Sequence, residues 1–246
     1  MCVNYIPPHP ELLDTVMGVL IDLADLEGGA WKAETWKDYL APIVRRGEDG
    51  GREGLVASYG MVPRKRIPPH VRPFDTMNAR SETVGQLRSY SGAWKKGQFC
   101  LVPMTAFYEP CYESGKAIRW GIGMSDQSLF AVAGLWREWE GEDGRIEHSF
   151  TQLTMNADEH PLMKRFHKPG DEKRSLVIVP QNEWDDWLNV RDPEEARSFI
   201  RHYPHDLMTS WAFPVPPRKP KAATLAPESE SRADEPQPAP QIQLDL

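Results

Sequence analysis

The 246-residue chain carries 29 Lys and Arg residues against 36 Asp and Glu residues, and the resulting formal net charge of −7 excludes a uniformly basic nucleic-acid-binding protein. Hydrophobic residues make up 40% of the sequence. They form no run of about 18 apolar residues, so we expect a cytoplasmic protein without a membrane-spanning helix. The three cysteines lack the spacing of metal ligands, which predicts neither a metal nor another cofactor.

Cys2 directly follows the initiator methionine. Removal of that methionine would leave an α-amine, with an ordinary pKa of about 7.7 to 8.0, beside a thiol whose ordinary pKa is about 8.5. Such a 1,2-aminothiol can close a ring onto an aldehyde, because both groups are nucleophiles near neutral pH. The competing interpretation is an incidental cysteine in a frayed terminus.

The hydrophobic pattern predicts both helices and strands. Apolar residues at helical spacing after a proline predict an amphipathic helix over residues 10–26. Stretches rich in β-branched and aromatic residues predict strands at 55–59, 99–108, 128–136, 150–155 and 175–179. Residues 158–166 are predicted to be helical, and Asp192 is predicted to cap a helix that ends near residue 202. Helices and strands are segregated along the chain, so the predicted class is α+β, with one domain over residues 1–212.

A cationic window lies at residues 62–96, where eight Lys and Arg residues face two acidic residues, a charge of +6. Within its Pro-rich part, Arg64, Arg66 and Arg72 are candidates for contacts with a DNA backbone. The competing interpretation is a solvated surface that only improves solubility.

Three further motifs place polar residues where a core would not favour them. Asn78 and Arg80 project from one face of an extended chain. Glu109 ends an apolar strand, directly after two aromatic residues. His167 directly follows the helix predicted over residues 158–166. The last two are suited to acid–base chemistry. Each of these residue types alone is more often structural than catalytic.

Taken in order, these segments resemble the SOS-response-associated peptidase (SRAP) family of abasic-site processing proteins. The resemblance is carried by Cys2, NARSETV at 78–84, CLVPMTAFYEP at 100–110, FAVAGLWREW at 130–139 and HPLMKRFHKP at 160–169, which leads into SLVIVP at 175–180. The family resemblance implies a single domain with a β-barrel-like, mostly antiparallel core flanked by helices.

The resemblance also implies an activity and a set of roles. Cys2 would form a thiazolidine DNA–protein crosslink with an abasic site in single-stranded DNA and so shield the lesion. Asn78 would orient the site, Arg80 would contact a DNA phosphate, and Glu109 and His167 would move protons. We expect a monomer that acts without a cofactor, with single-stranded DNA as its partner.

The chain departs from the family pattern at several positions. It begins Cys2-Val3-Asn4 where family members commonly read Cys-Gly-Arg. Tyr59 stands where a tryptophan is common, and we expect it to stack on a base. The loop after His167 is longer than usual, which makes His160 a second candidate for the active-site histidine.

The C-terminal segment, residues 213–246, is rich in Pro, Ala, Glu and Ser and is predicted to be disordered. Its last six residues, 241–246, resemble the bacterial sliding-clamp-binding motif. Gln241, Leu244 and Leu246 are the candidate clamp-binding residues, and docking of such an extended peptide in an apolar groove is a common recognition mode. The competing interpretation is an incidental terminus.

Two other functions fit the sequence. A peptidase with an N-terminal cysteine nucleophile, which could remove Met1 from its own chain, would use Cys2 and would require an oxyanion hole. A non-enzymatic adaptor for single-stranded DNA would use the cationic window and the tail, and it would not depend on Cys2.

Overall fold

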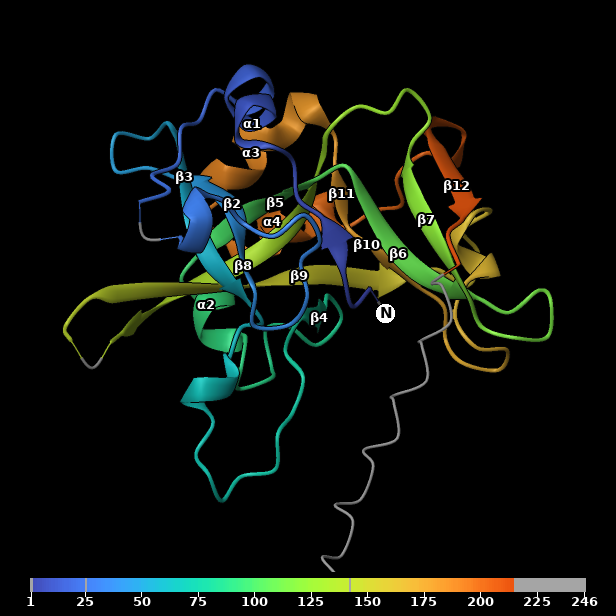
Figure 1. Ribbon diagram of the computed structural model, residues 1–246, viewed down its shortest axis with the longest axis horizontal. Helices are drawn as coiled ribbons and strands as arrows, with labels where there is room; N and C mark the ends of the chain where they lie inside the picture. Colours follow the sequence, from blue (N-terminus) through green and yellow to red (C-terminus); the bar gives the residue numbers. More distant parts are fainter. Residues whose placement is uncertain (1, 25, 142, 215–246) are drawn as a thin grey trace, which may run out of the picture. The chain divides into compact units, whose positions relative to one another are not determined.

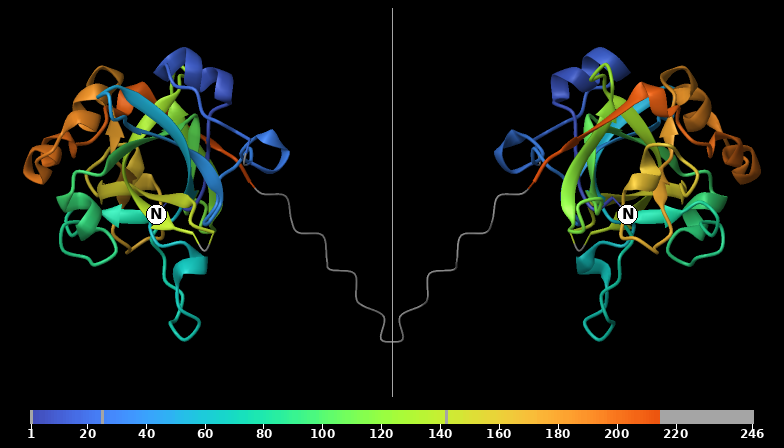
Figure 2. Two further views of the ribbon diagram at one scale, coloured as in Figure 1. Left: turned by 90° about the vertical axis from the view of Figure 1, so that its left-hand side faces the viewer. Right: turned by 90° about the vertical axis from the view of Figure 1, so that its right-hand side faces the viewer.

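The computed structural model describes residues 2–24, 26–141 and 143–214. Five strands close into a barrel in the order β2 (Leu40–Arg46), β3 (Arg52–Tyr59), β9 (Ile146–Asn156), β8 (Phe130–Glu140) and β5 (Phe99–Met104), with β5 pairing back to β2. All of these pairings are antiparallel except that of β3 with β9. The strands curve around a common centre in both views of Figure 2. The predicted α+β class with a barrel-like core is confirmed.

Short strands extend the barrel sheet, and a second sheet lies beside it (Figure 1). The extensions are β4 (Asn78–Arg80) and β10 (Arg174–Leu176), which pair with β9, and β11 (Ile178–Val179), which pairs with β8. The second sheet has the order β1 (Tyr5–Ile6), β6 (Ala106–Cys111), β7 (Ile118–Met124) and β12 (Met208–Ala212). The single strand predicted over 99–108 is therefore two strands in two sheets, divided at Thr105.

The helices are short. They are α1 (Pro10–Met17), α2 (Ser91–Lys95), α3 (Trp184–Asn189) and α4 (Pro193–Ala196). Single 3-10 turns lie at Glu27–Gly29, Arg64–Arg66, Met163–Arg165, Gln181–Glu183, Arg197–Phe199 and His205–Leu207. Within the described ranges, no helix is long and apolar enough to cross a membrane.

All three helix predictions were wrong in extent. The helix predicted over residues 10–26 ends at Met17, because Gly18 adopts a left-handed conformation with φ of 67° that stops the helix. The helix predicted over 158–166 is only the 3-10 turn at Met163–Arg165. The helix predicted to end near residue 202 ends at Ala196 and is followed by the 3-10 turn at Arg197–Phe199. Its predicted cap at Asp192 is confirmed, since that side chain accepts a hydrogen bond from the Glu194 amide.

The apolar residues form two clusters on opposite faces of the barrel wall. Strand β5 supplies both, with Leu101 in one and Cys100 and Val102 in the other. Burial on both faces explains why this strand is a continuous apolar run rather than an alternating one. The first cluster packs α1 and α3 against the barrel, whereas the second combines residues of the barrel strands with residues of the second sheet, such as Phe107 and Ile122. Cys2 belongs to the second cluster.

Gly134 in β8 has no room for a side chain. A Cβ atom there would lie 2.7 Å from the Thr151 carbonyl oxygen and 2.9 Å from the Cys100 sulfur. We expect Gly134→Ala to lower the free energy of unfolding by about 1 to 3 kcal/mol, because a packed core resists added volume. The measurement is equilibrium unfolding in urea.

Gly92→Ala is the matched control. A Cβ atom at Gly92, within α2, meets nothing within 4 Å. That substitution should raise the free energy of unfolding by about 0.5 to 1 kcal/mol, since alanine favours the helix over glycine. Equal effects of the two substitutions would contradict this description of the barrel wall.

Candidate active site around Cys2

Cys2 is anchored within the core and is only 1% exposed. Its backbone carbonyl accepts a hydrogen bond from the Asn78 side-chain amide at 2.6 Å and lies 3.4 Å from the Tyr59 hydroxyl. Its thiol donates to the Asn4 carbonyl at 3.3 Å. Strand β1 begins three residues later, at Tyr5, and pairs with β6. Cys2 therefore does not lie in a frayed terminus.

Burial raises the pKa of the Cys2 thiol far above its ordinary value, and the nearby Glu109 charge raises it further. The thiol is therefore protonated at neutral pH. Any reaction at this sulfur requires a neighbouring group that accepts its proton, because the thiolate is the stronger nucleophile. Glu109 is the acidic residue whose charge acts on the thiol, which makes its carboxylate the candidate for this role.

Glu109 and His167 form a buried pair, with 3.0 Å between the Oε2 and Nε2 atoms. Their side chains are 3% and 7% exposed. Glu109 lies in β6, and the His167 amide donates to the carbonyl of the adjacent Pro110 at 2.9 Å. The structure thus brings together two residues that are 58 positions apart in the sequence. Such a pair can share and relay a proton.

The backbone of His167 is held in an unusual conformation, with φ of 66°. A non-glycine residue in this region typically costs about 1 to 3 kcal/mol. Two contacts hold it there: the hydrogen bond to Pro110, and one from the Lys173 ammonium group to the His167 carbonyl at 3.2 Å. Backbone strain held in place beside a buried acid–base pair is typical of a functional site.

Asn78 and Arg80 lie on β4, which runs parallel to β9. The Asn78 amide reaches Cys2, whereas Arg80 is exposed and forms an ion pair with Glu172 at 2.5 Å. Ala79, between them, is fully buried. This alternation agrees with the prediction that Asn78 and Arg80 share a face. The Asn78 amide is directed toward the buried Cys2, whereas the Arg80 guanidinium lies at the protein surface.

Tyr59 does not occupy the position expected for a DNA-stacking residue. Its ring is fully buried and stacks on Phe150 with 5.2 Å between the ring centroids. Its hydroxyl donates to the Gln152 side chain at 3.1 Å, next to the Cys2 carbonyl. The burial leaves no ring face for a base, so Tyr59 supports the floor of the site instead.

The remaining cations expected at DNA lie at different places. Arg64 and Arg72 are exposed, on the segment that extends away from the barrel in Figure 1. Arg66 is partly buried, pairs with Glu147 at 2.9 Å and lies over the Trp139 ring. It is therefore already engaged within the protein, whereas the other two remain accessible.

His160 has a structural role. Its Nδ1 atom accepts hydrogen bonds from the Leu162 and Met163 amides at 3.2 and 3.1 Å. Its Nε2 atom lies 3.1 Å from the Tyr203 carbonyl. Both ring nitrogens of His160 are thus engaged with backbone, whereas His167 lies against Glu109, which keeps His167 as the candidate for the active-site histidine.

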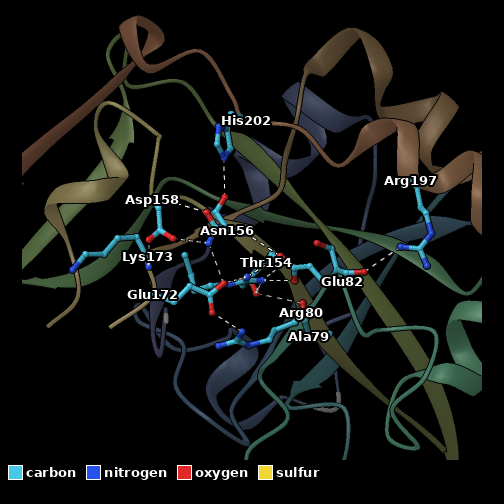
Figure 3. Close-up of polar contacts among 12 residues, drawn as sticks. Ala79, Arg80, Glu82, Thr154, Asn156, Asp158, Glu172, Lys173, Arg197 and His202 are labelled. Atoms are coloured by element: carbon cyan, nitrogen blue, oxygen red, sulfur yellow. Dashed lines mark hydrogen bonds and ion pairs between the residues drawn. The ribbon is translucent and has the colours of Figure 1, made fainter. Parts of the chain in front are cut away.

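Sequence reasoning missed an ion-pair network beside the site (Figure 3). Arg174 is 2% exposed and binds Glu82 and Glu172 at 2.8 and 2.7 Å. Glu172 also pairs with Arg80, so the network ends at the rim. The lengthened loop after His167 was the one signal, but the sequence does not reveal that this loop returns to β4.

The described residues include no cluster of three or more His, Cys, Asp or Glu side chains that could hold a metal ion. The candidate clamp-binding residues Gln241, Leu244 and Leu246 lie outside the described residues. The candidate catalytic residues that the structure brings together are Cys2, Glu109 and His167, and Asn78 is the candidate positioning residue.

Comparison with known proteins identifies related sequences and a related crystal structure. A family model described as SOS response associated peptidase (SRAP) matches residues 31–216. The matched range begins after Cys2. A crystal structure of a protein from Bordetella bronchiseptica superimposes with a TM-score of 0.75 and is 32% identical, covering 87% of this chain and all of that one.

Two curated relatives from Bacillus subtilis are named abasic site processing proteins. YoqW is 27% identical over 152 residues, which cover 59% of this chain and 64% of that protein. YoaM is 27% identical over 203 residues, which cover 78% of this chain and 84% of that protein. The match to YoqW thus spans less than two thirds of its length.

The raised pKa of the Cys2 thiol predicts slow alkylation of the native protein. We expect iodoacetamide to modify native Cys2 at least about tenfold more slowly at pH 7.5 than in urea, since one pKa unit changes the thiolate fraction tenfold. The native rate should also keep rising above pH 9. Mass spectrometry of the N-terminal peptide measures both rates.

The urea-unfolded chain is the control, and its rate should level off just above the ordinary thiol pKa of about 8.5. A native rate that levels off at the same pH as the unfolded chain would contradict the assigned burial.

Proposed function

The chain belongs to the SOS-response-associated peptidase family, and we propose that it recognises abasic sites in single-stranded DNA and captures them covalently through Cys2 after removal of Met1. The observation that carries the proposal is the anchoring of Cys2 by Asn78 beside the buried pair of Glu109 and His167. The printed names of YoqW and YoaM support the abasic site as the substrate.

The capture proceeds in two bond-forming steps. The open-chain sugar of an abasic site carries an aldehyde. The Cys2 amine adds to its carbon, and loss of water from the carbinolamine leaves an imine. The Cys2 sulfur then adds to the imine carbon while the nitrogen gains a proton, which closes a five-membered thiazolidine ring. The product is a crosslink that shields the lesion.

Both steps require proton transfers that the site residues can perform. Because the Cys2 thiol is protonated, a base must accept its proton as the sulfur–carbon bond forms. We assign this role to Glu109, whose charge acts on the thiol. His167, 3.0 Å from Glu109, would hold and protonate the sugar oxygen during ring opening.

Asn78 and Arg80 have positioning roles in this proposal. An amide side chain has no useful acid–base chemistry, so Asn78 acts by fixing the Cys2 carbonyl. Arg80, on the same strand, would bind a phosphate that flanks the lesion. The exposed residues Arg64 and Arg72 would add weaker, salt-dependent contacts.

Covalent capture predicts a band on a denaturing gel. The full chain, with its native N-terminus verified by mass, is incubated with a single-stranded oligonucleotide that contains one abasic site. A shifted band should appear with this DNA and be absent with intact DNA. Cys2→Ala should abolish the band, and Glu109→Gln should slow its formation about 100-fold or more, as expected for loss of an acid–base group.

Cys111→Ala is the matched control, since it removes another buried cysteine of the same core cluster and should leave the band unchanged. Absence of the band from the folded, correctly processed protein would overturn the proposal. Peptide cleavage that depends on Cys2 would then support the peptidase hypothesis. Equal binding of intact and abasic DNA without any Cys2 dependence would support the adaptor hypothesis.

We also propose that residues 241–246 bind the bacterial sliding clamp, on the basis of the sequence motif alone. Deletion of these residues should abolish binding to a purified clamp in surface plasmon resonance and leave crosslink formation unchanged. A variant with the same six residues in scrambled order controls for length and charge. Unchanged clamp affinity of the deletion variant would contradict this partner.

A further inference from the structure

The guanidinium group of Arg80 already has an anionic partner. Its Nη1 atom lies 2.5 Å from the Glu172 Oε2 atom (Figure 3). Arg80 is about half exposed and Glu172 about one third exposed, so the ion pair lies at the surface of the site. A carboxylate and a phosphate oxygen use the same guanidinium donors. A DNA phosphate that approaches Arg80 must therefore displace the Glu172 carboxylate from the guanidinium group.

Glu172 is held in this position by other contacts. Its Oε1 atom accepts hydrogen bonds from Arg174 at 2.7 Å and from the Asn156 side chain at 3.2 Å, which leaves Oε2 directed at Arg80. Arg174 is itself buried and fixed by Glu82. The Arg174 guanidinium lowers the pKa of Glu172 to about 2, so its carboxylate keeps its charge at neutral pH.

Hydrogen bonds of Lys173 hold the loop that carries Glu172 in place. The Lys173 amide donates to the Asp158 side chain at 2.8 Å, and the Lys173 ammonium group donates to the carbonyls of His167 and Lys168. The Glu172 carboxylate is thus placed by the fold rather than by chance contact of a flexible side chain. This distinguishes it from an ordinary surface ion pair, which fixes little.

We propose that Glu172 is a specificity-determining residue that competes with DNA phosphate for Arg80. The inference rests on the proposed binding of single-stranded DNA and adds to it. DNA binding must exchange the carboxylate for a phosphate, so non-covalent affinity for any strand is reduced. Intact DNA is then released readily, whereas an abasic strand that reaches Cys2 is retained by its covalent bond. Glu172 thereby makes retention depend on the chemistry of the lesion.

The test uses non-covalent binding, which separates it from crosslinking. Fluorescence anisotropy of a labelled, intact single-stranded oligonucleotide is measured with the full chain carrying Cys2→Ala, near 0.1 M salt. Glu172→Gln should tighten binding about twofold to fivefold, the range expected for release of one exposed ion pair. Glutamine keeps the length of the side chain and an oxygen for Arg174, and a thermal melt verifies the fold.

Asp171→Asn is the matched control. It removes the same charge from the neighbouring residue of the loop, whose side chain forms no hydrogen bond or ion pair with the described part of the chain. Any general gain in DNA affinity that comes from the loss of one negative charge should appear equally in both variants. The excess gain of Glu172→Gln should vanish when Arg80→Ala is also present, because the two residues act as one pair.

The outcomes are distinct. A larger gain for Glu172→Gln than for Asp171→Asn, lost in the Arg80→Ala background, supports the competition. Equal gains in the two variants, or an excess that survives Arg80→Ala, would overturn it even where the protein binds DNA and forms the crosslink. Failure of the parent protein to bind any single strand would overturn the proposed function and this inference together.

Discussion

The hydrogen bond from Asn78 to the Cys2 carbonyl is the contact on which the rest of the site depends. A chain terminus ordinarily retains much conformational freedom, and fixing it requires compensating contacts. Here strand β4, held in parallel against β9, supplies the amide that fixes Cys2. Strand β1 holds the next residues against β6, which is also the strand that carries Glu109. The two sheets therefore fix the position of Cys2, the candidate nucleophile, from both sides.

Burial of Cys2 has a chemical cost and a chemical use. It raises the pKa of the thiol, so the sulfur is a poor nucleophile until a neighbour takes its proton. The same burial places the thiol under the influence of Glu109, and Glu109 contacts His167. In the proposed function, this arrangement would restrict reaction at Cys2 to a substrate that enters the site and engages the pair of Glu109 and His167.

The segment after His167 links the inner and outer parts of the site. Lys173 supports the strained backbone of His167, and Glu172 binds the exposed guanidinium of Arg80. Arg174 binds Glu172 and is itself held by its ion pair with Glu82. A buried arginine of this kind is retained only when its partners compensate the loss of hydration. The lengthened loop is therefore part of the site, although it contributes no reacting atom.

Local sequence patterns determined the α+β class, the apolar strands around Phe99 and Phe150, and the identity of the polar residues Cys2, Asn78, Glu109 and His167 as candidates. These features follow from side-chain chemistry and short-range periodicity. The tertiary structure alone decided that the apolar run beginning at Phe99 divides at Thr105 into strands of two different sheets. It also decided that Tyr59 is buried and that Glu172 forms an ion pair with Arg80. Each of these depends on pairings between strands far apart in the chain, for which a single sequence carries no local signal.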